Sequence, residues 1–246
     1  MTVPAEWFRE WFGEAYLSLY PHRDEEEAAR GVHLFLGHAG LEKGARVLDL
    51  ACGAGRHLDR LRAAGLAATG VDLSRPLLAD AAARPGVIGR LVRGDMRELP
   101  FRDAAFEGLV NFFTSFGYFL TPEEDVRVIT EMRRVLRHGH PFMVDYLNAA
   151  RVTARLEPET VSERGGRRVR QTRWVEGDHV FKKIEILDDG NGEPDVYHER
   201  VRLYRPETLE ALLDRHGLSV ARRCGSYDGA DFGPESPRLI LLGEAT

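Results

Sequence analysis

The run from Val47 to His57 constrains the fold of this chain more than any other feature. An apolar strand leads directly into a tight turn that holds Gly53 and Gly55, and a helical pattern begins at once. A second short strand then ends on the acidic residue Asp72, about twenty residues further on. This arrangement is typical of a parallel sheet that binds an adenine nucleoside cofactor at the carboxyl ends of its strands. The run alone leaves two cofactors open, a dinucleotide or S-adenosylmethionine.

The hydrophobic pattern predicts helices and strands that alternate along the first part of the chain. Proline and glycine residues mark the ends of the expected helices. The expected helices cover residues 5–20, 24–38, 55–64, 76–83 and 122–136. The expected strands cover residues 45–50, 67–72, 88–93, 106–112 and 141–147. Strands that alternate with helices in this way imply an α/β fold with a doubly wound, mostly parallel sheet.

The pattern changes in residues 167–204, where apolar and polar side chains alternate. Glycine and aspartate turns separate the segments, so we predict an antiparallel β-meander inserted into the main fold. A helix at 206–215 and two strands near 218–224 and 238–242 complete a seven-stranded, Rossmann-like sheet. The three segments of the meander are 168–174, 180–187 and 196–204.

Composition narrows the range of partners and locations. The net charge of −5 argues against a nucleic-acid partner, because phosphate contacts need concentrated lysine and arginine. Cys52 and Cys224 are the only cysteines, so the chain suits a reducing cytoplasm. Neither a signal peptide nor a membrane-spanning stretch is expected. No metal is expected either, because the nine histidines lack the spacing of metal ligands.

The glycine turn favours one of the two cofactors. Gly53 and Gly55 allow the backbone to approach a ligand closely, and the helix that follows offers free N–H groups. A dinucleotide site also needs a third glycine three positions later, where this chain has Leu58. The sequence therefore disfavours a dinucleotide, and the structural alternative is a tight turn without a ligand.

Two acidic residues that follow later strands have the positions of cofactor ligands. Asp72 can accept both hydroxyl groups of a ribose, and it remains available because Ser74 serves as the cap of the next helix. Asp95, after the third strand, can accept an adenine amino group while Met96 packs on the ring. For each aspartate the alternative is a structural role, as a helix cap or in a turn.

In this order the motifs resemble those of the class I S-adenosylmethionine-dependent methyltransferases, of the small-molecule type with a β insertion. The matching segments are Asp49–Gly55, Gly70–Ser74 and Gly94–Met96, and the likeness covers residues 40–148 well. One departure lies in Val135–Phe142, where the family usually has a Pro-Gly-Gly turn. That departure affects packing below the sheet and leaves cofactor binding untouched.

The resemblance implies that S-adenosylmethionine is the cofactor and assigns residues to it. Asp49 would orient the methionyl ammonium from beneath the turn, and Asp72 would hold the ribose. In related enzymes an N-terminal helix with similarly spaced tyrosines covers the cofactor, although core packing explains such tyrosines equally well. The full set of expected cofactor-binding residues is Asp49, Ala51, Cys52, Gly53, Asp72, Leu73, Asp95, Met96, Asn111, Phe112, Tyr16 and Tyr20.

The sequence says less about which residues contact the methyl acceptor. Aromatic side chains after the fourth strand can tolerate a sulfonium and shield the transfer from water, or they can belong to the core. Polar groups at the cleft mouth are candidate contacts, but none has the neighbours that a general base needs, so no catalytic residue is assigned. The expected residues of the acceptor pocket are Phe116, Tyr118, Asp145 and Asn148.

These expectations divide the chain into parts. The N-terminal helical lid is 1–40, the cofactor-binding core is 41–150 with 205–246, and the insertion over the acceptor pocket is 151–204. Within the insertion Arg164–Trp174 is basic, yet strand alternation puts Arg168 and Arg170 on one face and Arg173 on the other. We interpret this stretch as a solvated hairpin face. Were it to bind a ligand, an anionic small acceptor would suit the net charge better than RNA.

We therefore expect an enzyme that moves a methyl group by in-line transfer to a nitrogen or oxygen of a small molecule, as a monomer or homodimer. An NAD(P)-dependent oxidoreductase is the first alternative, disfavoured by Leu58 and by the absence of a Tyr-x-x-x-Lys pair. The second alternative is a non-catalytic module that binds the cofactor and transfers nothing.

Overall fold

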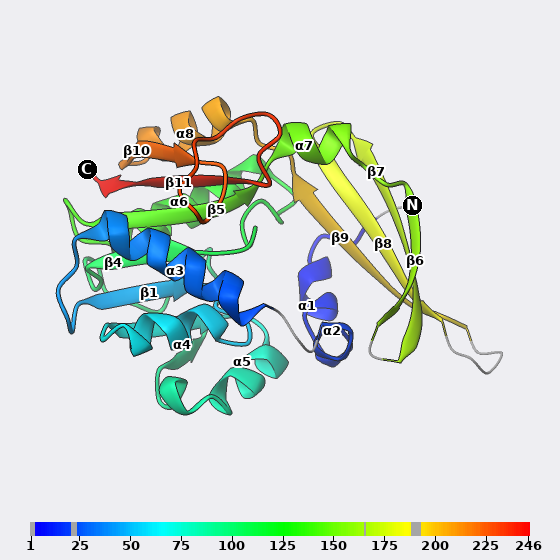
Figure 1. The fold of residues 1–246 in the computed structure, drawn as a ribbon, viewed down its shortest axis with the longest axis horizontal. Helices are drawn as coiled ribbons and strands as arrows, with labels where there is room; N and C mark the ends of the chain where they lie inside the picture. Colours follow the sequence, from blue (N-terminus) through cyan, green and yellow to red (C-terminus); the bar gives the residue numbers. More distant parts are fainter. Residues whose placement is uncertain (1–2, 21–23, 165, 188–192) are drawn as a thin grey trace.

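The computed structural model describes residues 3–20, 24–164, 166–187 and 193–246. It contains two sheets, with short N-terminal helices between them (Figure 1). The larger sheet has seven strands in the order β10-β11-β5-β4-β1-β2-β3, and the smaller has four in the order β6-β7-β8-β9. The predicted α/β class, with a mostly parallel sheet and a β insertion, is confirmed.

The larger sheet is parallel except at one strand, β11, which runs antiparallel to both β5 and β10. β1 pairs with β2 on one side and with β4 on the other, so the strand order reverses beside β1. Ligands of open α/β sheets bind at such a reversal, beyond the carboxyl ends of the strands. The strands are β1 Arg46–Leu50, β2 Ala67–Asp72, β3 Leu91–Arg93, β4 Gly108–Asn111, β5 Pro141–Leu147, β10 Leu218–Cys224 and β11 Arg238–Ala245.

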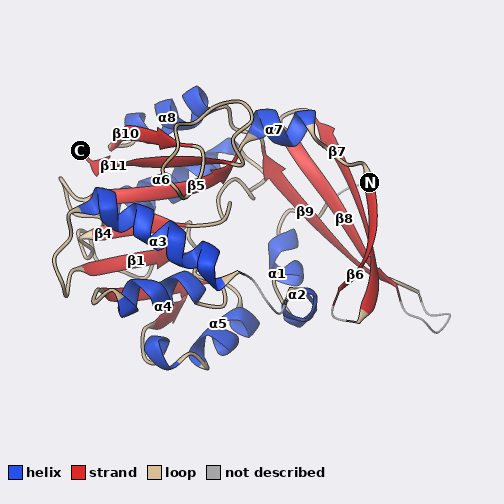
Figure 2. Cartoon of the chain, viewed as in Figure 1, coloured by secondary structure: helices blue, strands red, loops and turns tan. Residues whose placement is uncertain are grey.

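Helices cover both faces of this sheet (Figure 2). Strand side chains alternate between the faces, so that Val47 packs in the core beneath α3 and α4 while Leu48 packs beneath α6 and α8. Because each face is apolar, burial on both sides stabilises the sheet. The helices are α3 Glu25–Ala39, α4 Arg56–Ala63, α5 Arg75–Ala82, α6 Pro122–Val135 and α8 Pro206–Arg215.

The insertion is a sheet of four antiparallel strands, whereas the sequence predicted three. The strand that was missed, β6, lies at the edge of the sheet, and its Val161 is 55% exposed. It has no buried apolar face, so hydrophobic periodicity carries no signal for it. The elements of the insertion are α7 Ala149–Ala154, β6 Glu159–Arg164, β7 Arg167–Glu176, β8 His179–Leu187 and β9 Asp195–Arg202.

The N-terminal segment forms two short helices instead of the single helix predicted at 5–20. They are α1, Trp7–Trp11, and α2, Glu14–Leu19, separated by an extended backbone at Gly13. The break lets side chains of both helices enter the core between the two sheets, where Trp11 is fully buried. By contrast α3, which the sequence analysis grouped with the N-terminal lid, packs on the larger sheet.

In the part of the chain that the structure describes, no helix combines the length and apolar character needed to cross a membrane. Cys52 and Cys224 are both buried and free of disulfides.

Candidate active site

A cavity of about 1450 Å³ lies beyond the carboxyl ends of β1, β2 and β4 and reaches the inner face of the insertion. Residues of α1 and α2 line it as well, which agrees with the place of these helices between the two sheets in Figure 1. Ligand pockets typically enclose roughly 300–1,000 Å³. This cavity therefore has room for two ligands, a cofactor and a small second molecule.

The turn between β1 and α4 forms part of the cavity wall, and its backbone depends on small residues. Ala51, Gly53 and Gly55 have φ values of 58°, 53° and 76°, in the left-handed region that favours glycine. Gly70 of β2 lies against the turn, where a Cβ would stand 2.6 Å from the Cys52 Sγ atom. Small side chains therefore let the turn pack on β2 and expose its backbone to the cavity.

Asp72, at the end of β2, is fixed at the cavity wall by two backbone N–H groups. Gly53 N donates to its Oδ2 and Ser74 N to its Oδ1, each at 2.8 Å. Burial raises the pKa of Asp72, although these hydrogen bonds oppose the shift. Each carboxylate oxygen still has acceptor capacity, which suits a vicinal diol in the cavity. Ser74 accepts a hydrogen bond from Leu77 N, so the predicted helix cap is confirmed.

Asp49 lies beneath the glycine turn and is only 1% exposed. Its Oδ2 atom has no hydrogen-bond partner among the described residues. Burial, reinforced by the nearby Asp72 carboxylate and opposed by Arg56, raises the pKa of Asp49 to about 8. A cation above the turn would favour the ionised carboxylate. This buried acid, with one oxygen left unsatisfied, fits a cofactor that carries ammonium and sulfonium charges.

Of the two expected residues at the end of β4, Phe112 lines the cavity and Asn111 lies behind its wall. The Asn111 side chain donates to the Leu50 carbonyl at 2.9 Å and so ties β4 to β1 beneath the cavity. Phe112 lines the cavity, and its ring stacks on His57 with centroids 3.9 Å apart and planes at 6°. The stacked pair makes this part of the wall flat and aromatic.

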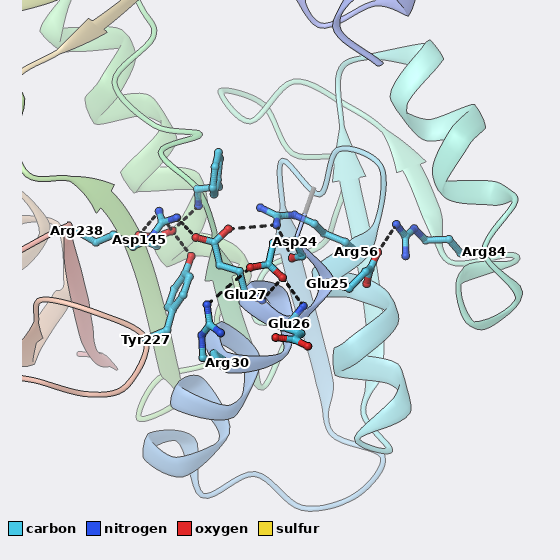
Figure 3. A network of polar contacts seen from close by, with 11 residues as sticks. Asp24, Glu25, Glu26, Glu27, Arg30, Arg56, Arg84, Asp145, Tyr227 and Arg238 are labelled. Carbon is cyan, nitrogen blue, oxygen red and sulfur yellow. Dashed lines mark hydrogen bonds and ion pairs between the residues drawn. The ribbon is translucent and has the colours of Figure 1, made fainter. Parts of the chain in front are cut away.

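A polar network, shown in Figure 3, holds the loop that follows β4. Phe113 has a φ of 61°, a strained value for a non-glycine residue. Its N–H donates at 2.7 Å to Asp145, whose carboxylate also accepts from Tyr227 and Arg238 and is fully buried. Arg238 pairs in turn with Glu27 at the start of α3. Contacts from β5, β11 and α3 therefore hold the strained loop in place.

The predicted contacts to adenine, Asp95 and Met96, also line the cavity. Asp95 forms an ion pair of 2.7 Å with Arg97, a residue that the sequence analysis did not single out. Arg97 also pairs with Glu6, just before α1, and with Glu124 of α6, at 2.9 and 2.6 Å. Nothing in the sequence marks Arg97, because its partners are far apart along the chain.

The N-terminal helices place aromatic side chains over the cavity. Tyr16 and Tyr20 both line it, with ring centroids 5.1 Å apart, and Leu73 lines it from the end of β2. Trp11 Nε1 donates at 2.7 Å to Glu199 of β9. The first helix is therefore bonded directly to the insertion.

Three of the four residues expected in the acceptor pocket lie behind its wall, and only Tyr118 lines the cavity. Phe116 is buried against tyrosine rings of the core. Asp145 is enclosed by the network described above. Asn148 caps α7 and donates to three carbonyls of residues 233–236. Asp145 and Asn148 are displaced from the pocket for one reason: β11 pairs with β5, and the loop that leads into β11 covers the polar side chains at the end of β5.

Strand residues of the insertion form much of the acceptor half of the cavity. The predicted alternation in β7 is confirmed, because Arg168 and Arg170 are exposed while Arg173 lines the cavity. The interpretation of this stretch as a solvated face is wrong for Arg173, because the strand face that carries it turns toward the cavity. The residues that line this half include Leu147, Val152, Leu156, Arg173, Val180, Phe181, Lys182, Glu199 and Val201.

The known proteins that this chain resembles are methyltransferases, which agrees with a site for S-adenosylmethionine. Residues 47–139 match a family described as a methyltransferase domain. The chain is 28% identical over 198 residues to the glycine/sarcosine N-methyltransferase of Aphanothece halophytica, covering 76% of this chain and 71% of that protein. It is also 28% identical to the dTDP-3-amino-3,6-dideoxy-alpha-D-glucopyranose N,N-dimethyltransferase of Streptomyces fradiae, with 76% and 75% covered.

The solved structures show the same fold. An S-adenosylmethionine-dependent methyltransferase from Clostridium acetobutylicum superposes with a TM-score of 0.79 at 20% identity, over 94% of this chain and 96% of that one. The matched domain and the relatives favour methyl transfer over hydride transfer and over a non-catalytic module. Residues 47–139 therefore form a methyltransferase domain, and the chain shares its fold with S-adenosylmethionine-dependent methyltransferases.

Proposed function

We propose that this enzyme methylates a nitrogen or oxygen atom of a small molecule held in the insertion half of the cavity. The observation that carries the proposal is one continuous cavity that joins the glycine turn to the inner face of β7, β8 and β9. Bound S-adenosylmethionine supplies an electrophilic methyl group on its sulfonium sulfur. The chain itself positions the two reactants and excludes water, so no residue is assigned as a general base.

Each cofactor-side residue has a proposed role that follows from its position. Asp72 accepts the ribose hydroxyls, and the backbone around Gly53 borders the methionyl group. Asp49 balances the ammonium charge from beneath the turn, while Asp95 and Met96 border the adenine. The support for these roles is the geometry of the cavity wall, in which Asp72 is held by two backbone donors.

The acceptor is proposed to be small because the insertion and the N-terminal helices enclose its half of the cavity. The names of the two relatives agree, since one acts on glycine and sarcosine and the other on an amino sugar nucleotide. We further propose that the enzyme is cytoplasmic, acts as a monomer or homodimer and binds no nucleic acid. The net charge of −5 and the two free cysteines support this part of the proposal.

Two measurements test the proposal. Calorimetric titration is expected to show binding of S-adenosylmethionine and none of NADH. Incubation with methyl-labelled cofactor and fractionated cell extract is expected to label metabolites. Label that enters protein or RNA instead would contradict a small acceptor. Cofactor binding without label in any fraction would contradict the transferase activity itself.

A further inference from the structure

The acceptor half of the cavity contains a positive charge that no carboxylate among the described residues pairs with. Several cations of the wall are paired, for example Arg84 with Glu25 at 2.8 Å and Lys182 with Glu199 at 2.6 Å. Within the described ranges, three wall cations form no ion pair. Arg75 and Arg93 are exposed near the adenine end of the cavity. Only Arg173 is half-buried in the acceptor half.

Arg173 is oriented by neutral groups. Its guanidinium donates to the Gln171 side chain, to Thr160 Oγ1 at 3.1 Å and to the Glu157 carbonyl at 3.4 Å. Gln171 is itself 3% exposed and donates to Tyr20 at 3.3 Å. Neutral acceptors fix the direction of a guanidinium but leave its full charge available to a ligand.

Sheet pairing makes this charge costly without a ligand. Arg173 stands directly opposite Lys182 in the register of β7 and β8. Side chains that oppose one another directly have Cβ atoms about 4.5–5.5 Å apart, and like charges there are destabilising. The Glu199 carboxylate lies opposite Lys182 on the far side and pairs with it, while also accepting from Trp11. Across these three strands, the single negative charge of Glu199 thus stands beside the two positive charges of Lys182 and Arg173.

We infer that the methyl acceptor carries an anionic group, a carboxylate or a phosphate, and that Arg173 binds this group beside Lys182. The inference rests on the proposed function, because it names the class of acceptor for the same site. A guanidinium suits this role, since its planar fork matches either anion with two parallel hydrogen bonds. The paired Glu199 and Lys182 then form a polar edge beside the anion.

A binding measurement tests the anion site without methyl transfer. The protein is saturated with S-adenosylhomocysteine, and its thermal unfolding is followed in inorganic phosphate or acetate at constant ionic strength, with chloride as reference. The variants are Arg173→Gln and the matched control Arg170→Gln, which removes the same charge from the exposed face of the same strand. Unfolding in chloride establishes first that both variants fold.

We expect phosphate or acetate to raise the Tm of the wild type and of Arg170→Gln, and to leave the Tm of Arg173→Gln unchanged. A shift with phosphate indicates a phosphorylated acceptor, and a shift with acetate indicates a carboxylated one. An equal shift in Arg173→Gln, or no shift beyond chloride in the wild type, overturns the inference.

A transfer measurement separates this inference from the proposed function. The labelled product is expected to be retained on an anion exchanger at a pH above the pKa of any amine that it contains. Arg173→Gln is expected to lower kcat/KM about 10- to 100-fold, the usual effect of a lost charge-assisted hydrogen bond. The Kd for S-adenosylmethionine is expected to change less than about twofold, since the residue lies in the other half of the cavity. A product that carries no negative charge at that pH overturns the anionic acceptor and leaves methyl transfer standing. If no product forms at all, the proposed function fails, and the thermal unfolding measurements above still decide the anion site.

Discussion

At the scale of single residues, Asp49 sets the charge beneath the glycine turn. Its pKa is about 8 in the folded protein, against an ordinary value of 3.8, mainly because it is buried. The folded protein therefore holds this proton more tightly than the unfolded chain does. It follows that the contribution of Asp49 to stability is lost as the pH rises from about 4 to about 8.

The same pKa predicts that cofactor binding releases a proton at pH 7. The positive charges of S-adenosylmethionine stabilise the Asp49 carboxylate and lower its pKa, so affinity rises with pH and levels off above about 8. Calorimetry in buffers of different ionisation enthalpy measures the release. We expect none in Asp49→Asn, whereas Asp228→Asn, at an exposed position outside this cavity, should behave as the wild type. Equal proton release in all three proteins would contradict the role of Asp49.

Asp72 is expected to contribute to cofactor affinity through a hydrogen bond to the ribose. In Asp72→Asn one acceptor oxygen is replaced by an amide donor, so a charge-assisted hydrogen bond to the ribose is lost. We expect the Kd for S-adenosylmethionine to rise about 10- to 100-fold, a loss of about 1.5–3 kcal/mol. Asp228→Asn again serves as the control, and titration calorimetry is the measurement. An unchanged Kd would mean that Asp72 only anchors the turn.

At the scale of elements, Arg97 connects the first helix to the cofactor side of the cavity. It pairs with Asp95 at the cavity wall, with Glu6 next to α1 and with Glu124 of α6. Its guanidinium also lies 4.6 Å from the ring centroid of Phe119. Together these contacts make the position of α1 depend on the loop that holds Asp95.

Replacement of Arg97 is therefore expected to loosen the N-terminal helices. In Arg97→Gln three carboxylates lose their shared cation, so we expect faster proteolysis near residues 3–20 and a Kd for S-adenosylmethionine about tenfold higher. Limited proteolysis and titration calorimetry measure the two effects. Arg134→Gln, which breaks ion pairs of α6 away from the cavity, is the control. Proteolysis that proceeds equally in both variants would contradict the connection.

The elements also show where sequence reasoning succeeds and why it stops. The strand ending at Asp72 and the cap at Ser74 were predictable, because each follows from a pattern within a few residues. The edge strand containing Val161 was not, because an exposed strand has no hydrophobic periodicity. Likewise Asp145 was expected in the acceptor pocket, and only the pairing of β5 with β11 reveals that it is buried. The acceptor half depends on contacts between distant strands, which local patterns do not contain.

At the scale of the whole molecule, one buried ion pair joins the insertion to the larger sheet's helical layer. Arg202 of β9 donates to Asp125 of α6 at 3.1 Å, and Tyr204 donates to the same carboxylate at 2.8 Å. Burial raises the pKa of Asp125 to about 6, although both donors oppose the shift. The contribution of Asp125 to stability therefore falls as the pH rises from about 4 to about 6.

Removal of the cation should destabilise the entire fold. Arg202→Met leaves the Asp125 carboxylate buried without a cation, so we expect the free energy of unfolding to fall by about 3–5 kcal/mol at pH 7. The pKa of Asp125 rises further in this variant, so its loss of stability should continue above pH 6. Urea unfolding between pH 5 and 8 measures both effects. Arg168→Met, at an exposed position of β7, should change stability by less than about 0.5 kcal/mol. A loss of similar size in both variants would contradict the assignment.

The hydrogen bond between Trp11 and Glu199 has a consequence for following the enzyme at work. The fluorescence of the Trp11 indole reports whether α1 is in contact with the insertion. When α1 and the insertion separate, the indole N–H exchanges its hydrogen bond to the Glu199 carboxylate for one to water. With Trp7 and Trp174 replaced by phenylalanine, Trp11 would be the sole emitter among the three tryptophans. Stopped-flow emission after rapid mixing with the methyl donor would then show whether α1 leaves the insertion while the donor enters, without an attached dye.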